Sequence, residues 1–85
     1  DGYTLVDGRV EIEELEEYFG VTFDEGKYET LGGLILNTVK RIPAAGETII
    51  VDNFEMTIVA ADERRIKKVR IRKIRKEDEQ NSPEA

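Results

Sequence analysis

Four glutamates near the N-terminus are the residues best suited to metal chemistry: Glu13, Glu14, Glu16 and Glu17. Carboxylate oxygens suit hard cations such as Mg²⁺. Glu13 and Glu17 stand one helical turn apart, so they could share an ion. Mg²⁺ keeps several waters and needs few protein ligands, however, so a cluster of carboxylates does not distinguish a metal site from an ordinary acidic surface. A solvated helix face, with acids favoured near the helix N-terminus by the dipole, explains the same residues. We therefore predict no metal site.

Two residue types that carry much enzyme chemistry are absent. The sequence has no histidine, which removes the commonest general base and the commonest transition-metal ligand. It has no cysteine either, which excludes a disulfide framework, a thiolate zinc site and a thiol nucleophile. We therefore predict that the chain is not an enzyme, with no catalytic residue, no cofactor-binding residue and no resident cofactor.

The dipeptide Gly32-Gly33 follows Thr30, a good N-cap residue, in a predicted first helical turn. Backbone N–H groups at such a turn can bind phosphate. The spacing of a P-loop or a dinucleotide fingerprint is absent, however, and no strand directly precedes the pair. Two glycines in a helix cost about 1 kcal/mol each relative to alanine. Close approach of another backbone, which a Cβ would prevent, is the explanation that we favour.

Charge is distributed unevenly along the chain. Residues 1–29 hold ten acids and two bases, whereas residues 64–76 hold nine bases and no acid. The basic run contains no aromatic residue on which a nucleic-acid base could stack. Its cations alternate with apolar residues, as on a solvated sheet face, and cations on an edge strand also discourage aggregation. The alternatives are docking on an acidic protein or neighbouring domain, and binding to nucleic acid or anionic lipid. We predict no nucleic-acid partner and a candidate interaction surface of Arg65, Lys68, Arg70 and Arg72.

The first of two predicted helices covers residues 11–19. Within it Ile12, Leu15 and Phe19 recur at helical spacing and form one apolar stripe. Gly20 is well placed to end this helix.

The second predicted helix runs from residue 30 to about residue 41. It has a broad apolar face formed by Leu31, Leu34, Ile35, Val39 and Ile42. Lys40 and Arg41 suit the negative C-terminal end of the helix dipole, and Pro43 is expected to stop the helix.

Strands make up the rest of the pattern. Residues 3–6 form a short predicted strand, closed by Asp7-Gly8, a turn dipeptide that tolerates positive φ. From residue 47 the apolar period becomes two, which predicts strands at 48–51 and 54–60. A last strand begins at Ile66 and bulges or ends near Ile74, where the alternation breaks.

The order of strand, helix, helix and three strands indicates the α+β class. We predict a mostly antiparallel sheet of about four strands with two helices on one face. The ordered domain is expected to span residues 1–76, and the acidic tail at 77–85, which lacks apolar periodicity, to be disordered. No stretch is long and apolar enough for membrane insertion, so we expect the chain itself to be soluble.

Four short motifs occur in the order that is typical of one family. They are Val6-Asp7-Gly8-Arg9, Thr30-Leu31-Gly32-Gly33, Ile42-Pro43 followed by Gly46-Glu47, and Arg65-Ile66 through Val69-Arg70-Ile71. Each motif alone is weak, but four in register from about residue 2 to residue 74 are specific. In these motifs the chain resembles the CorC/HlyC-type transporter-associated domain.

The resemblance implies a domain at the C-terminal end of bacterial membrane proteins, behind a transmembrane region and a pair of CBS domains. Those proteins are described as magnesium and cobalt efflux proteins or as hemolysin-like proteins. It also implies a regulatory or interaction role at the cytoplasmic face of the inner membrane, where the CBS domains and the membrane region are partners. The fold is expected to be similar to that of the FAD-binding domains of the PCMH type.

Two further expectations complete the functional prediction. The opposite charges of the two ends of the chain suggest a weak homodimer. The alternative function is a sensing module for FAD, an adenine nucleotide or Mg²⁺. FAD binding follows only from analogy of fold, and the chain has no glycine-rich pyrophosphate loop.

Overall fold

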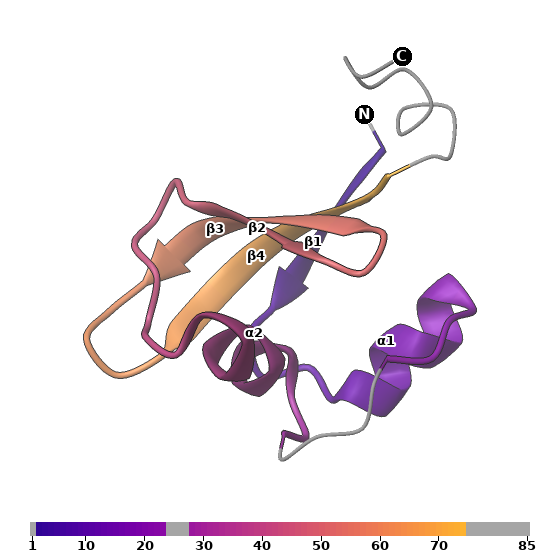
Figure 1. Cartoon of the computed structure of the whole chain (residues 1–85), viewed down its shortest axis with the longest axis horizontal. Helices are drawn as coiled ribbons and strands as arrows, with labels where there is room; N and C mark the ends of the chain where they lie inside the picture. Colours follow the sequence, from indigo (N-terminus) through magenta and orange to yellow (C-terminus); the bar gives the residue numbers. More distant parts are fainter. Residues whose placement is uncertain (1, 24–27, 75–85) are drawn as a thin grey trace.

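The computed structural model describes residues 2–23 and 28–74, which fold into one antiparallel sheet and two helices. The strands are ordered β1-β4-β3-β2, and every neighbouring pair is antiparallel. Both helices lie on the same face of the sheet (Figure 1). The predicted α+β arrangement is therefore confirmed. The elements are β1 (Tyr3–Asp7), α1 (Ile12–Phe19), α2 (Leu31–Val39), β2 (Thr48–Val51), β3 (Phe54–Ala61) and β4 (Ile66–Lys73).

The core lies between the sheet and the helices. Along the first part of β3 every second side chain is buried, at Phe54, Met56 and Ile58, because successive side chains of a strand point to opposite faces. In β4, by contrast, the buried residues Ile66 and Val69 are three positions apart. The register between β3 and β4 shifts twice, between Ile58 and Ala61, and this irregularity returns both residues to the inner face. The prediction that the last strand bulges or ends near Ile74 is confirmed by its end at Lys73, whereas the irregular pairing lies at the other end of β4.

Helix α2 is shorter at its C-terminal end than predicted. Lys40 has φ 64°, in the left-handed region, and its N–H bonds to the Leu36 carbonyl at 2.7 Å. The helix therefore ends at Val39 through an αL cap rather than at about residue 41 through Pro43. The predicted ends are confirmed at Gly20, which caps α1 with φ 70°, and at Thr30, the N-cap of α2.

The position of β4 corrects one interpretation of its cations. β4 pairs with β1 on one side and with β3 on the other, so it lies inside the sheet. The edge strands are β1 and β2. The cations of β4 therefore do not protect an exposed sheet edge, because the backbone of β4 is paired on both sides.

Two remaining expectations concern the C-terminal tail and the absence of a membrane-spanning segment. The disordered tail predicted at 77–85 lies outside the described residues, as does the C-terminal limit of the domain at residue 76. Within residues 2–23 and 28–74, neither helix has the length and apolar character needed to cross a bilayer.

Candidate functional site

Three of the four cations of the predicted interaction surface already have partners within the domain. Lys68, Arg70 and Arg72 lie on the face of the sheet that is turned away from the helices. The Lys68 ammonium is 3.7 Å from the Asp7 carboxylate, and the Arg70 guanidinium lies 4.7 Å above the centre of the Tyr3 ring. Arg72 donates from Nε to Glu55 Oε1 at 3.0 Å. These contacts cross from β4 to both neighbouring strands, and the carboxylates of Asp7 and Glu55 offset two of the four positive charges of the predicted surface.

Arg65, the fourth cation, lies in the turn between β3 and β4. Asp62 Oδ1 accepts hydrogen bonds from the backbone N–H groups of Arg64 at 2.8 Å and Arg65 at 2.9 Å. The pKa of Asp62 is lowered, mainly by the first of these bonds and then by the second. The Lys67 ammonium is 3.5 Å from the same carboxylate. The Asp62 side chain therefore holds the backbone of the turn, and the side chains of Arg64 and Arg65 remain exposed.

Three segments of backbone meet where Gly8, Gly32 and Ile66 come together. The Gly8 carbonyl accepts from Gly32 N–H at 2.8 Å. A Cβ on Gly8 would lie 2.2 Å from the Ile66 carbonyl oxygen, and a Cβ on Gly32 would lie 3.1 Å from the Gly8 carbonyl oxygen. Glycine is thus needed at position 8 because the backbone of Ile66 passes close to it. The positive φ that the Asp7-Gly8 dipeptide suggested is not the reason, since Gly8 does not have a positive φ.

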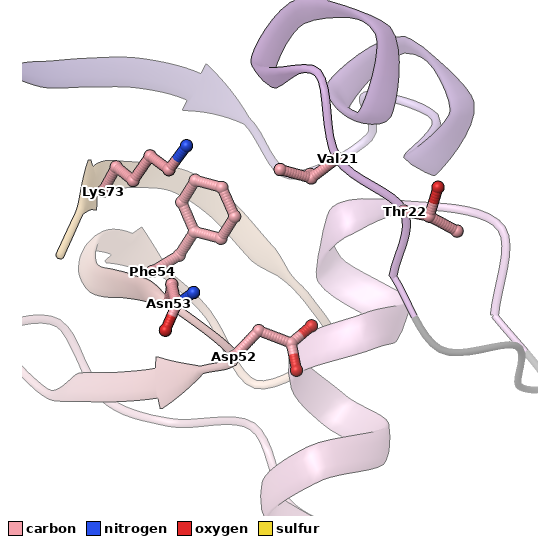
Figure 2. Close-up of a pocket in the computed structure, with 6 residues that line it drawn as sticks. All are labelled: Val21, Thr22, Asp52, Asn53, Phe54 and Lys73. Carbon is pink, nitrogen blue, oxygen red and sulfur yellow. The ribbon is translucent and has the colours of Figure 1, made fainter. Parts of the chain in front are cut away.

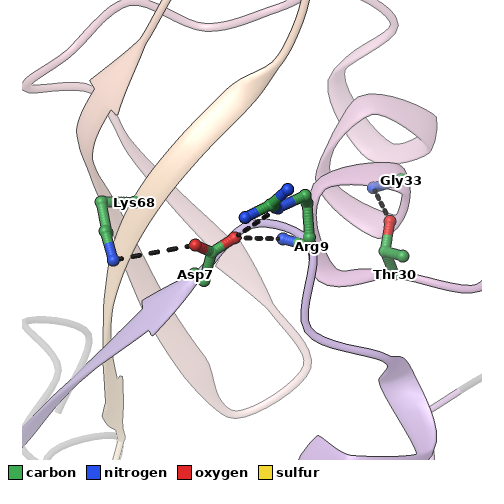
Figure 3. A network of polar contacts seen from close by, with 5 residues as sticks. All are labelled: Asp7, Arg9, Thr30, Gly33 and Lys68. Carbon is green, nitrogen blue, oxygen red and sulfur yellow. Dashed lines mark hydrogen bonds and ion pairs between the residues drawn. The ribbon is translucent and has the colours of Figure 1, made fainter.

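The pair Gly32-Gly33 divides between two roles. Gly32 makes the backbone contact that we predicted, whereas a Cβ on Gly33 would lie 3.2 Å from the Cβ of Tyr28, a side chain. The N–H groups of the first turn are all used within the protein. Leu31 donates to the Val10 carbonyl at 2.9 Å, Gly32 to the Gly8 carbonyl, and Gly33 to Thr30 Oγ1 at 3.2 Å (Figure 3). No donor of this turn is left for a phosphate, which supports packing as the reason for the two glycines.

A pocket of about 220 Å³ opens beside this meeting point. Gly8, Gly32 and Gly33 line it, and its apolar side chains are Leu36, Ile42 and Ile66. Arg9, Arg64 and Arg65 line it as well, and none of the acidic residues in the described ranges does. All four sequence motifs that carried the family resemblance contribute to this one pocket.

Asp7 contacts both the backbone and the side chain of Arg9, which lines the pocket. Asp7 Oδ1 accepts from the Arg9 N–H at 2.8 Å and lies 3.5 Å from Arg9 Nε (Figure 3). The backbone hydrogen bond from Arg9 is the main cause of the lowered pKa of Asp7. By contrast, the side chains of Arg64 and Arg65 form no ion pair with any residue in the described ranges.

The connector between α2 and β2 is held by a second carboxylate. Glu47 accepts two hydrogen bonds from the Arg41 guanidinium, at 2.7 and 2.9 Å, and one from Ala44 N–H at 2.7 Å. The Arg41 side chain, followed by the Ala44 N–H, lowers the pKa of Glu47 to about 2. This clamp closes the loop that contains the buried Pro43 and fixes Ile42 in the wall of the pocket.

A larger hollow of about 460 Å³ lies at the opposite end of the sheet. Figure 2 shows its residues, which come from the segment after α1, the β2–β3 turn and the end of β4: Val21, Thr22, Asp52, Asn53, Phe54 and Lys73. It contains one acid and one base and no cluster of ligating groups. Across the described part of the chain, no three carboxylates are placed to hold a metal ion.

The four glutamates of α1 do not form one uniform solvated face. Glu13, Glu14 and Glu17 are exposed, but Glu16 is half-buried, and its Oε2 accepts from the Phe23 N–H at 2.9 Å. Glu16 therefore fastens the segment after α1, where Phe23 enters the core. The expectation that Glu16 is an exposed carboxylate was wrong.

The pocket includes residues that sequence reasoning missed. Only Arg65 of its lining was among the predicted site residues. Arg9 and Ile42 belong to the recognised motifs, and Leu36 is an apolar residue of α2 that falls outside the helix's core-facing stripe. That leucine, which lies outside the apolar stripe that the sequence predicts for this helix, was the available signal, and the structure leaves its side chain 43% exposed.

Comparison with known proteins gives the family. The model of the transporter associated domain family, CorC_HlyC, matches residues 1–75. The chain belongs to this family. The magnesium and cobalt efflux protein CorC of Salmonella typhimurium strain LT2 is 38% identical over 61 residues, which cover 72% of this chain and 21% of that protein. The chain thus spans about a fifth of the length of this CorC relative.

Solved structures of the family have the same fold. The transporter associated domain CorC_HlyC from Nitrosomonas europaea has 36% sequence identity and a TM-score of 0.77, covering 86% of this chain and 88% of that one. The CorC_HlyC domain of a Xylella fastidiosa Temecula1 hemolysin also has 36% identity, with a TM-score of 0.76, and covers 88% of this chain and 91% of that one. The Xylella structure was solved in complex with Mg²⁺ and Mn²⁺.

Proposed function

We propose that this CorC_HlyC domain is a non-catalytic regulatory and interaction domain of a magnesium and cobalt efflux protein or a hemolysin-like membrane protein. In this role it contacts the CBS domains and the membrane region of the parent protein at the cytoplasmic face of the inner membrane. It modulates transport by the parent protein without itself taking part in ion movement.

The observation that carries this proposal is the family match over nearly the whole described chain, with a CorC efflux protein among the relatives. The internal use of the motif residues supports it. Asp7, Gly8, Gly32 and Glu47 make the hydrogen bonds and close contacts that hold the fold. The residues that remain for function are therefore surface residues, which favours binding to another protein surface over chemistry.

Removal of this domain from the parent protein tests the proposal. Ion efflux would be measured in membrane vesicles for the full-length parent and for a parent that ends before residue 1 of this chain. We expect efflux to persist and its dependence on ion concentration to change. Unchanged efflux and unchanged concentration dependence would contradict a regulatory role, and complete loss of efflux in a correctly inserted protein would favour a direct part in transport.

The Xylella domain solved with Mg²⁺ and Mn²⁺ favours a second candidate, a divalent-cation sensor. When the cation is present at 100 times its Kd, binding raises the free energy of unfolding by about 2.7 kcal/mol. For a domain of this size, that raises the thermal midpoint by roughly 10 °C or more. Thermal unfolding of the 85-residue chain with and without MgCl₂ or MnCl₂ separates the candidates. The interaction role predicts no such rise, and FAD and ATP can be tested in the same way.

A further inference from the structure

We propose that the pocket beside Gly8 and Gly32 is a docking site for an acidic segment of a partner protein that inserts one aliphatic side chain. The inference deepens the proposed function and rests on it, because it names the site and the chemistry of the contact. Its evidence is an apolar interior, a small volume and uncompensated arginines.

The apolar part of the pocket explains an otherwise misplaced leucine. Leu36 lies on α2 and is 43% exposed, although most large aliphatic side chains of this helix are buried. It lines the pocket together with Ile42 and Ile66. A concave surface lined by apolar side chains with a few polar groups at its edge is typical of a binding pocket. Insertion of an aliphatic side chain would cover Leu36 without moving the core.

The volume restricts what can enter. Pockets for drug-sized ligands measure about 300–1,000 Å³. This pocket, at about 220 Å³, is too small for FAD or an adenine nucleotide. One leucine-sized side chain and part of its backbone fit it better.

The charge of the pocket selects an acidic partner. Arg64 and Arg65 have no ion-pair partner within the described residues, whereas Lys68 and Arg72 on the sheet face are paired. Asp62 holds the backbone at both arginines, so their turn is already ordered before a partner binds. Guanidinium groups bind carboxylates through two parallel hydrogen bonds, which suits glutamate and aspartate on either side of the inserted residue.

The adjacent helix end does not supply an alternative anion site. The N–H groups of Leu31, Gly32 and Gly33 all donate to acceptors within the protein. Recognition of the acidic segment therefore falls to the arginine side chains, and this gives a testable dependence on single residues.

The test is an NMR titration of the 85-residue chain with a blocked pentapeptide that has a central leucine between pairs of glutamates. We expect the amide signals of Gly32, Gly33, Leu36 and Ile66 to shift together. Replacing the peptide's leucine by alanine should weaken binding about tenfold, as expected for a buried side chain. Raising the salt concentration should weaken binding too, since the arginine contacts are exposed.

Variants of exposed residues provide the controls. Arg65→Ala and Leu36→Ala should each weaken peptide binding several-fold, while Lys73→Ala, which removes a cation at the far end of β4, should leave it unchanged. Equal binding of the leucine and alanine peptides, shifts elsewhere, or no shifts at all would overturn the proposal. Displacement of the peptide by phosphatidylglycerol vesicles, with Arg65→Ala abolishing vesicle binding, would replace it with a lipid site. Because the titration uses the separate chain, its failure is distinguishable from a failure of the efflux experiment.

Discussion

Among the described glycines, Gly8 is the one with least room for a side chain. A Cβ there would lie 2.2 Å from the Ile66 carbonyl oxygen, a backbone atom that is held in the paired strand β4. We expect Gly8→Ala to lower the free energy of unfolding by at least about 3 kcal/mol, the upper part of the range for overpacking. Chemical denaturation measures this directly.

Gly33→Ala is the matched control. A Cβ at Gly33 would lie 3.2 Å from the Tyr28 Cβ, a contact that a shift of roughly a few tenths of an ångström relieves, and alanine gains about 1 kcal/mol in helix propensity. The variant should therefore be within about 1 kcal/mol of wild type. A Gly8→Ala protein as stable as Gly33→Ala would show that the meeting of the three backbone segments is not needed for the fold.

Glu47 gives the fold an acid-sensitive contact. Its pKa is about 2 in the folded protein against an ordinary value of 4.5. A group with a lowered folded pKa stabilises the protein above its unfolded pKa, and this contribution is lost as the pH falls through the folded value. The wild type should therefore be more stable than Glu47→Gln near neutral pH, and the difference should shrink as the pH falls from 4.5 to about 2.

Thermal unfolding of both proteins across this pH range tests the effect. Asp7 and Asp62, whose pKa values are also lowered, are present in both proteins and destabilise them equally in acid. The difference in stability between the two proteins therefore reports on Glu47 and its contact with Arg41. A stability difference that stays constant down to pH 2 would rule out an ionised Glu47 as its source.

At the scale of elements, Glu16 joins α1 to the segment that follows it. Its carboxylate accepts from the Phe23 N–H, and Phe23 packs against Phe54 of β3 with ring centres 5.7 Å apart. We expect Glu16→Ala to cost about 1.5–3 kcal/mol, as for a hydrogen bond to a charged group. Glu17→Ala on the exposed side of the helix should stay within about 0.5 kcal/mol. Equal effects of the two substitutions would show that the Glu16 bond does not contribute to stability.

The elements themselves were largely predictable because apolar periodicity reports local burial. The caps at Gly20 and Thr30 were readable for the same local reason. The order of strands was not, because pairing between β1 and β4 joins residues more than sixty positions apart and leaves no periodic signal. This is why the cations of β4 were misplaced on a sheet edge. The pairing of Lys68 with Asp7 depends on the same long-range register.

The candidate site was predictable only in part. Arg65 was selected from the basic run, but Arg64, its neighbour with the same exposed turn position, was not. Arg9 and Leu36 reach the pocket from distant parts of the sequence, and only the three-dimensional arrangement brings them together. Sequence motifs indicated which segments matter, and the close contact of Gly8 with Ile66 explains why those segments meet.

At the scale of the whole molecule, the opposite charges along the chain are partly neutralised within one copy. Ion pairs join Asp7 to Lys68 and Glu55 to Arg72. We therefore expect self-association of the separate chain to be weak and to decrease as salt rises, since exposed charges are screened beyond about 8–10 Å at physiological ionic strength. Sedimentation velocity at low and high salt measures this. A dimer that persists in high salt would point instead to an apolar interface.

We propose that this domain acts through contact with the rest of its parent protein. Amide hydrogen exchange of residues 2–23 and 28–74 would be compared between the full-length parent and the separate chain. We expect slower exchange in the parent, concentrated at the start of α2 and the turn between β3 and β4, with the far end of β4 unchanged. Identical exchange in both proteins at all of these positions would contradict it.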